Sequence, residues 1–305
     1  MHTPLLRLNL DGVEASRGEG APREVWLKLE NLQPIGSFKL RGACNAMASA
    51  GSERLVNGVF TASAGNMAQG VAWMARRFGV ACRVVVPDHA PATKLEAIER
   101  LGADVIKVPF EEWWQVMLTH EFPGLDGMFI HPVSDPAVIA GNGTIGLEIL
   151  EDLPDVDTVI VPYGGGGLSS GIASALRAAR PTAEVFACEV ETAAPLAASL
   201  EAGEPTDVEY IASFVDGIGA AGLLPEMWPL VSELLAGSLV VSLDEVAAAL
   251  RLIAERCRVI AEGAGAASVA AALTGASGEG KTVCVISGGN IDARKLATIF
   301  AGQTP

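Results

Sequence analysis

The sequence has little positive charge. Its 305 residues include 21 lysine and arginine residues against 36 aspartate and glutamate residues, a formal net charge of −15. Binding to the phosphates of nucleic acid requires clustered lysine and arginine side chains. The composition therefore argues against nucleic acid as a partner.

Cysteine is also scarce, and the five cysteines stand singly in the sequence. No CxxC pair or cysteine–histidine cluster is present, so a zinc site is not expected. An odd number of scattered cysteines argues against a disulfide framework and points to a reducing compartment. We expect a cytoplasmic protein.

Long uncharged apolar runs are missing as well. The least polar long stretch, residues 259–276, carries Glu262 and consists mostly of alanine and glycine. This composition predicts a tightly packed core helix rather than a membrane span. The N-terminal segment MHTPLLRLNLDGVE lacks a basic start followed by an apolar core, so we expect neither a signal peptide nor a membrane partner.

Short β-branched runs alternate with helical patterns along the whole chain. Strands are predicted at 24–30, 57–62, 82–87, 104–109, 157–163, 184–189, 238–242 and 281–287. Helices are predicted at 66–79, 90–102, 145–153, 168–180, 242–259 and 293–302, and a long loop at 201–226. This alternation is typical of an α/β protein with parallel sheets.

Four consecutive glycines follow a predicted strand in VPYGGGGLSSG, residues 161–171. Successive backbone N–H groups and the next helix N-terminus can converge there on an anion. The dinucleotide fingerprint fails, because Ser169 stands where its third small residue should be, and no nucleotide P-loop motif follows. A phosphate cradle without nucleotide apparatus is favoured over a tight turn alone.

Three other segments carry candidate polar groups. Ser63 and Asn66 lie at a strand-to-helix turn in SAGNMAQG, where helix capping is the alternative explanation. Ser287 ends an apolar strand in ISGGNID, where its hydroxyl could meet a ring nitrogen or form a cap. Lys39 lies in NLQPIGSFKLRGACNA, almost without other charges. It is either a surface lysine at a helix start or a lysine held in a pocket for covalent chemistry.

Taken in order, five segments resemble the fold-type II pyridoxal-phosphate enzymes, above all the threonine/serine dehydratase (ammonia-lyase) family, which is related to serine racemase. The segments are ENLQPIGSFKLRGA, SAGNMAQG, HPVSDPAVIAGNGTIGLEIL, VPYGGGGLSSGIA and SGGNID. The resemblance spans roughly residues 3–292. It implies two open parallel-sheet domains, like those of the tryptophan synthase β chain, with pyridoxal 5'-phosphate in the cleft between them.

The resemblance also implies roles for individual residues. Lys39 would form the Schiff base and later remove the substrate Cα proton, since a partly desolvated lysine becomes a competent nucleophile and base. The other implied cofactor contacts are Phe38, Asn66, Gly164, Gly165, Gly166, Gly167, Leu168, Glu262 and Ser287. The implied substrate contacts are Ser63, Ala64, Gly65, Asn66 and Met67. Glu262 could instead be a carboxylate favoured at a helix start.

By the same resemblance, β-elimination would convert L-threonine and/or L-serine to 2-oxobutyrate or pyruvate and ammonia. Ala64 stands where similar racemases have a proton-donating serine, so racemisation should be poor. Met67 replaces the histidine usual after Asn66, which affects the expected carboxylate site. Glu189 and the Ala193 carbonyl match a cation site of some relatives, but Pro195 replaces an aspartate ligand, so no metal is expected.

The expected large domain combines residues 1–45 with 138–305, and residues 46–137 form a small, mobile domain. Family members are commonly homodimers, so a homodimer is expected. Other fold-type II activities stay open: a 3-hydroxyaspartate or diaminopropionate ammonia-lyase, or a serine racemase. A pyridoxal-phosphate-binding protein without catalysis is the alternative of another class, and the failed fingerprint argues against a nicotinamide-dependent enzyme.

Overall fold

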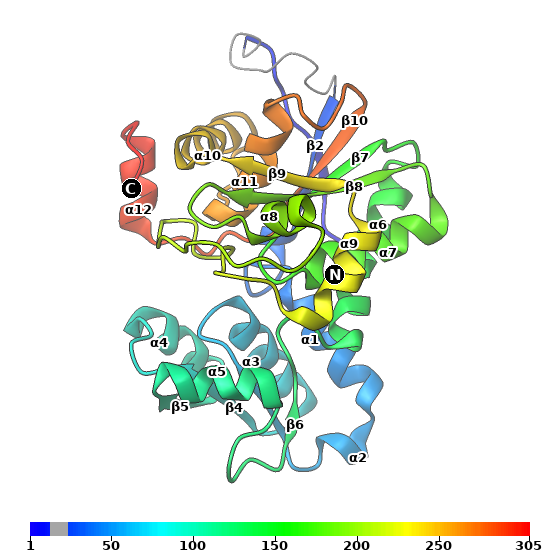
Figure 1. Cartoon of the computed structure of the whole chain (residues 1–305). Coiled ribbons are helices and arrows are strands. Elements are labelled where there is room, and N and C mark those ends of the chain that lie inside the picture. The colour runs from blue at the N-terminus through cyan, green and yellow to red at the C-terminus, as the bar shows by residue number, and fades with distance from the viewer. Residues whose placement is uncertain (13–23) are drawn as a thin grey trace. The chain divides into compact units, whose positions relative to one another are not determined.

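The computed structural model describes residues 1–12 and 24–305, which form two compact units (Figure 1). Unit 1 comprises residues 1–37 and 143–305, and unit 2 comprises residues 38–142. The range 1–45 predicted for the large domain includes residues 13–23, which lie outside the described residues.

Unit 1 is built on a six-stranded sheet with the order β1-β2-β10-β7-β8-β9. Only β1 and β2 pair antiparallel, and the other neighbours pair in parallel. The strands are β1 (Leu5–Arg7), β2 (Glu24–Leu29), β7 (Thr158–Pro162), β8 (Glu184–Val190), β9 (Gly237–Val241) and β10 (Lys281–Ile286). Because β7, β8 and β10 run in parallel, the turns that follow them leave the same edge of the sheet.

Helices pack on this sheet and on one another. They are α7 (Gly167–Ala179), α8 (Pro195–Ala202), α9 (Trp228–Leu234), α10 (Leu243–Cys257), α11 (Gly263–Leu273) and α12 (Ala293–Phe300), with short 3-10 turns η2 (Glu30–Leu32) and η3 (Pro225–Met227). The small side chains of α11 let it pack directly against β7, β8, β9 and β10, and α10 lies against α11. The predicted core helix is thus confirmed, and no helix among the described residues is long and apolar enough to cross a membrane.

Unit 2 contains a four-stranded parallel sheet with the order β5-β4-β3-β6. Its strands are β3 (Val59–Ala62), β4 (Cys82–Pro87), β5 (Asp104–Val108) and β6 (Met128–Phe129), and its helices are α1 (Lys39–Ala50), α2 (Ser52–Leu55), α3 (Asn66–Phe78), α4 (Ala92–Arg100) and α5 (Phe110–Thr119). Helix α6 (Pro136–Asp152) begins in unit 2 and continues into unit 1.

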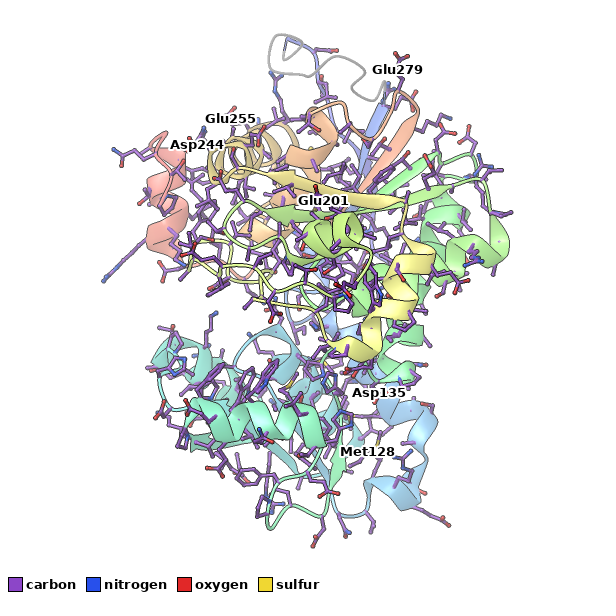
Figure 2. All side chains as sticks on the ribbon, viewed as in Figure 1. Met128, Asp135, Glu201, Asp244, Glu255 and Glu279 are labelled. Carbon is purple, nitrogen blue, oxygen red and sulfur yellow. The ribbon has the colours of Figure 1, made fainter. Side chains whose placement is uncertain are left out.

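The predicted α/β class with open parallel sheets is confirmed, and all eight predicted strands are present. The capping box that opens α10 is formed by Ser242 and Glu245. The helix predicted at 145–153 is longer and starts at Pro136. Acidic residues such as Glu201, Asp244, Glu255 and Glu279 are exposed on unit 1, which keeps much of the negative charge in water (Figure 2).

Candidate active site

The glycine run lies between β7 and α7. Gly166 is the N-cap of α7 with φ of 93°, and no side chain caps the helix. A Cβ on Gly166 would lie 3.0 Å from Val231 Cγ1 and 3.3 Å from the Tyr163 ring, so a side chain would be strained by the left-handed backbone and would force these neighbours to shift. Gly167 and Leu168 are the first two residues of this 13-residue helix. The arrangement presents backbone N–H groups at a positive helix end, as an anion site requires.

Ser287 follows β10 and is 3% exposed. Cys284 of β10 pairs with Ile160 of β7, so Ser287 leaves the sheet at the edge from which the glycine run also starts. The start of α11 comes close, because a Cβ on Gly265 would lie 3.3 Å from the Ser287 backbone nitrogen. Ser287 therefore lies in closely packed surroundings at the edge of the sheet where ligands gather in such folds.

Glu262 is a buried carboxylate at the N-cap of α11. Its backbone N–H donates to the Gly288 carbonyl at 2.9 Å. A Cβ on Gly288 would come within 2.6 Å of Glu262 Oε1, and one on Gly217 within 3.1 Å. The carboxylate thus lies against two glycines, and one of them adjoins Ser287.

Gly217 also links Glu262 to the glycine run. A Cβ on Gly164 would be 3.6 Å from the Gly217 carbonyl oxygen, an ordinary contact distance. Gly217 belongs to residues 203–224, which form no helix or strand, as predicted for the long loop at 201–226. Unit 1 therefore brings the glycine run, Glu262 and Ser287 together through Gly217 and Gly288.

In unit 2, Lys39 is the first residue of α1 and is half-buried. Its Nζ donates a hydrogen bond to the Pro132 carbonyl oxygen at 2.7 Å and lies 5.1 Å from the centre of the Phe38 ring. The amine is held by a backbone oxygen and an aromatic ring, rather than extending freely into solvent. The surface-lysine interpretation does not fit this geometry.

The segment 63–67 joins β3 to α3. Gly65 is the N-cap of α3 and receives no help from a side-chain cap, while the Ser63 hydroxyl accepts from the Gly65 N–H at 3.2 Å. Ser63, Ala64 and Asn66 are all half-buried. Met67 is 1% exposed and packs in the core of unit 2, so its thioether adds apolar contact there.

Two turns of unit 2 leave the same edge of its sheet. β3 and β6 pair in parallel, with Val59 opposite Met128, and the Thr61 hydroxyl donates to the Ile130 carbonyl at 2.8 Å. The turn after β6, residues 131–134, therefore starts beside the segment 63–67. Figure 2 labels Met128 and Asp135, which bracket this turn; the Asp135 carboxylate accepts from the Ala137 N–H at 2.7 Å at the start of α6.

Glu189, one of the two weak metal candidates, makes structural hydrogen bonds within unit 1. Glu189 is 1% exposed and accepts hydrogen bonds from the Leu196 N–H, the Ala197 N–H and the Ser238 hydroxyl at 2.7–2.9 Å. It thereby satisfies the N-terminus of α8, and burial is the main reason why its pKa is raised. Among residues 1–12 and 24–305, no cluster of three histidine, cysteine, aspartate or glutamate side chains could hold a metal ion.

His131 and Pro132 were assigned no role from the sequence, although they lie in one of the family segments. Pro132 holds Lys39, and His131 is buried beside it with a pKa lowered to about 4, chiefly by burial. The only available signal was a histidine between an apolar strand and the turn residues Pro132 to Pro136. The hydrogen bond from Lys39 to the Pro132 carbonyl spans 93 residues of sequence, and such a bond to a backbone atom leaves no pattern in a single sequence.

The residues present fit pyridoxal phosphate in each unit. Unit 1 offers a helix N-terminus for a phosphate, in a turn where a Cβ would clash, and a serine hydroxyl at the same sheet edge. Unit 2 offers a half-buried lysine amine beside an aromatic ring. An anion cradle, a hydroxyl and an accessible amine are the groups that a phosphorylated pyridine aldehyde requires.

Comparison with known proteins gives a consistent result. The family model described as pyridoxal-phosphate dependent enzyme matches residues 2–289. The chain is 44% identical over 281 residues to an L-threonine ammonia-lyase of Thermotoga maritima, covering 91% of this chain and 70% of that protein. It is 40% identical to the L-threonine dehydratase catabolic TdcB of Escherichia coli K12, covering 90% and 85% of the two chains.

Among solved structures, maize serine racemase superimposes with a TM-score of 0.87 at 31% identity, covering 99% of this chain and 92% of that one. The predicted family and its cofactor, pyridoxal phosphate, are confirmed by these matches. The chain belongs to the family of pyridoxal-phosphate dependent enzymes.

Proposed function

We propose that this chain is a pyridoxal-phosphate-dependent ammonia-lyase that converts L-threonine and/or L-serine to 2-oxobutyrate or pyruvate and ammonia. The observation that carries the proposal is the half-buried Lys39, whose amine is held 2.7 Å from the Pro132 carbonyl oxygen. The 40–44% identity to threonine ammonia-lyases supports the same substrate class.

The roles of the chain's residues follow from their chemistry. When bound, pyridoxal phosphate supplies an electron sink for the negative charge that develops at the substrate Cα. The N–H groups of residues 164–168 would hold its phosphate, the Ser287 hydroxyl would serve its ring nitrogen, and Phe38 would pack beside it. Asn66 would hydrogen-bond the ring hydroxyl, and Lys39 Nζ would take the proton from the substrate Cα. Glu262, buried against Gly288, completes the surroundings of Ser287.

The proposal includes a substrate carboxylate bound at residues 63–67. Gly65, Asn66 and Met67 lie at the start of α3, where backbone N–H groups and the helix dipole favour an anion. The Ser63 hydroxyl lies in the same turn. Met67 is buried, so it shapes this turn from the core side.

Elimination is favoured over racemisation at this site. Racemisation needs a proton donor on the face of Cα opposite the lysine, and Ala64 has no proton to give. The similarity to maize serine racemase keeps racemisation as the second candidate function. Chiral analysis of recovered serine separates the two activities.

We further propose a homodimeric, cytoplasmic enzyme in which residues 46–137 form a small domain that moves when substrate binds. Family resemblance supports the dimer, and the scattered, free cysteines support a reducing compartment.

The deciding experiment is 2-oxo acid release by the purified protein with pyridoxal phosphate, with L-threonine and L-serine tested in parallel. Formation of 2-oxobutyrate or pyruvate supports the ammonia-lyase. A protein that keeps its bound-cofactor absorbance but releases no 2-oxo acid from either substrate contradicts this function and favours another fold-type II activity or a non-catalytic carrier.

A further inference from the structure

His131 is a buried titratable side chain to which the proposed function gives no task. It is 2% exposed and follows β6 directly after Ile130. Its ring lies 5.0 Å from the ring of His120, the C-cap residue of α5, and 5.9 Å from the ring of Phe129. A buried histidine needs a reason for its polar atoms, since an apolar side chain would fill the same space at lower cost.

The Nδ1 atom of His131 organises the turn that follows it. It accepts hydrogen bonds from the Val133 N–H at 3.1 Å, the Ser134 N–H at 2.8 Å and the Ser134 hydroxyl at 3.0 Å. Two backbone donors at one nitrogen require that Nδ1 carries no hydrogen, so the neutral ring is protonated at Nε2. These bonds fix the peptide groups on the C-terminal side of Pro132.

The charge state of the ring agrees with this role. Burial, then electrostatic interaction with His120 and with Lys39, lower the pKa of His131 to about 4. Within the described residues Nε2 has no hydrogen-bond partner of good geometry, and the Met117 carbonyl is the weakest influence on this pKa. The ring is therefore neutral at pH 7, and its acceptor is always available to the turn.

The fixed turn includes the carbonyl that holds the lysine. The Pro132 carbonyl oxygen accepts from Lys39 Nζ at 2.7 Å, and its peptide carbon is bonded to the Val133 nitrogen, whose N–H donates to His131. Because the peptide unit is planar, anchoring the Val133 N–H sets the direction of the Pro132 carbonyl.

We propose that His131 is a positioning residue. It fixes the 131–134 turn so that the Pro132 carbonyl holds the Lys39 amine in place when that amine is not bonded to the cofactor. The inference rests on the proposed function only in taking Lys39 as the reactive lysine. It concerns the amine when it is not bonded to the cofactor, which is the form that takes and returns a proton.

The test compares His131→Leu with His131→Asn in the full chain freed of cofactor. Asparagine Oδ1 takes the place of Nδ1 and can accept from the turn, whereas leucine cannot. The readout is trace labelling of Lys39 by acetic anhydride, quantified by mass spectrometry against the exposed Lys107. A carbonyl acceptor favours the unreactive ammonium form, so its loss speeds labelling.

We expect His131→Leu to raise the relative labelling of Lys39 about tenfold, as the loss of a hydrogen bond to a charged group implies, and His131→Asn to stay within about twofold of wild type. His89→Leu, at an exposed histidine of the same unit, is the matched control and leaves labelling unchanged. Equal labelling of Lys39 in the wild type and in a folded His131→Leu protein overturns the proposal.

If His131→Leu does not fold, His131→Phe decides, because it keeps an aromatic ring in the buried space and removes the acceptor for both backbone donors, Val133 N–H and Ser134 N–H. Faster labelling of Lys39 in that variant supports the proposal, and unchanged labelling overturns it. With cofactor and threonine, His131→Leu should lower kcat while KM changes little, since only the proton-transfer geometry is affected.

The two proposals fail in different ways. If the wild type has no lyase activity but His131→Leu still speeds the labelling of Lys39, the proposed function is wrong and the positioning role stands. If the wild type is an active lyase but the labelling of Lys39 is the same in His131→Leu, only the positioning role is wrong.

Discussion

The two units contribute different kinds of chemical group to the proposed function. Unit 1 presents mainly backbone groups, in a glycine turn at a helix N-terminus, and its Glu262 side chain lies against the backbone of Gly217 and Gly288. Unit 2 presents side chains, with Lys39 at the start of α1 and His131 in the turn after β6. A backbone site is sensitive to any added Cβ, whereas a side-chain site is sensitive to the loss of one functional group. Substitutions can therefore test each kind of construction separately.

The largest effect is expected for Lys39→Ala, which removes the only group that unit 2 contributes to covalent chemistry in the proposed function. Turnover should fall by at least about 10³-fold, because both the anchor and the base are lost. The measurement is 2-oxobutyrate release from L-threonine, with Lys107→Ala in the same unit as the control. Substantial turnover by Lys39→Ala without added amine would show that another group is the base.

His131 should make unit 2 sensitive to acid. Its pKa is lowered from 6.5 to about 4, mainly by burial, so the unfolded chain binds a proton that the folded chain resists. The free energy of unfolding therefore falls as the pH falls from about 6.5 to about 4, by about 3 kcal/mol.

Urea unfolding at pH 7 and at pH 4.5 measures this loss, followed by fluorescence of Trp73, Trp113 and Trp114 in unit 2. In His131→Asn the pH-dependent loss from this residue is absent. An identical pH dependence in the wild type and His131→Asn would refute the assignment.

Gly166→Ala tests the backbone construction of unit 1. The new Cβ would meet Val231 at 3.0 Å in a left-handed conformation, so the turn must shift. We expect the affinity for pyridoxal phosphate to fall about tenfold and the stability to fall by about 1–3 kcal/mol.

The matched control is Gly203→Ala, at another left-handed glycine of unit 1 where nothing lies within 4 Å of the new Cβ. It carries the conformational strain without the crowding and lies at the end of α8. Its cofactor affinity should equal that of wild type. Equal loss of affinity in both variants would mean that the glycine turn has no special relation to the cofactor.

The smallest effect is expected for Ala64→Ser in unit 2. The new hydroxyl follows β3 and supplies a proton donor that the wild type lacks at this place. Chiral chromatography should detect some D-serine while elimination from L-serine persists. Complete absence of the D-isomer would show that position 64 alone does not set the outcome.

The sequence predicted the parts of the fold that depend on local pattern. All eight strands recognised from β-branched runs are present, since buried parallel strands need continuous apolar residues. Elements that were not predicted include β1 and β6, which have three and two residues, and the helices α1, α2, α5, α8 and α9. Short or weakly patterned elements form because their neighbours fix them.

The candidate site divides in the same way. Residue types and spacing marked the glycine run, Ser287 and Lys39 as candidates, and the resemblance to known enzymes implied their roles. No sequence pattern indicates that Glu189 accepts hydrogen bonds from the N-terminus of α8, or that Met67 is buried. Those outcomes depend on which strands become neighbours.

By itself the sequence determined the α/β class through local patterns and the cofactor family through its resemblance to known enzymes, and it singled out Lys39 as the proposed reactive lysine. The tertiary structure decided what touches that lysine. The Pro132 carbonyl reaches Lys39 only because β6 pairs beside β3, and His131 can fix that carbonyl only where burial keeps its ring neutral. Hydrogen bonds to backbone atoms are independent of the partner's side chain, and so they leave no trace in a single sequence.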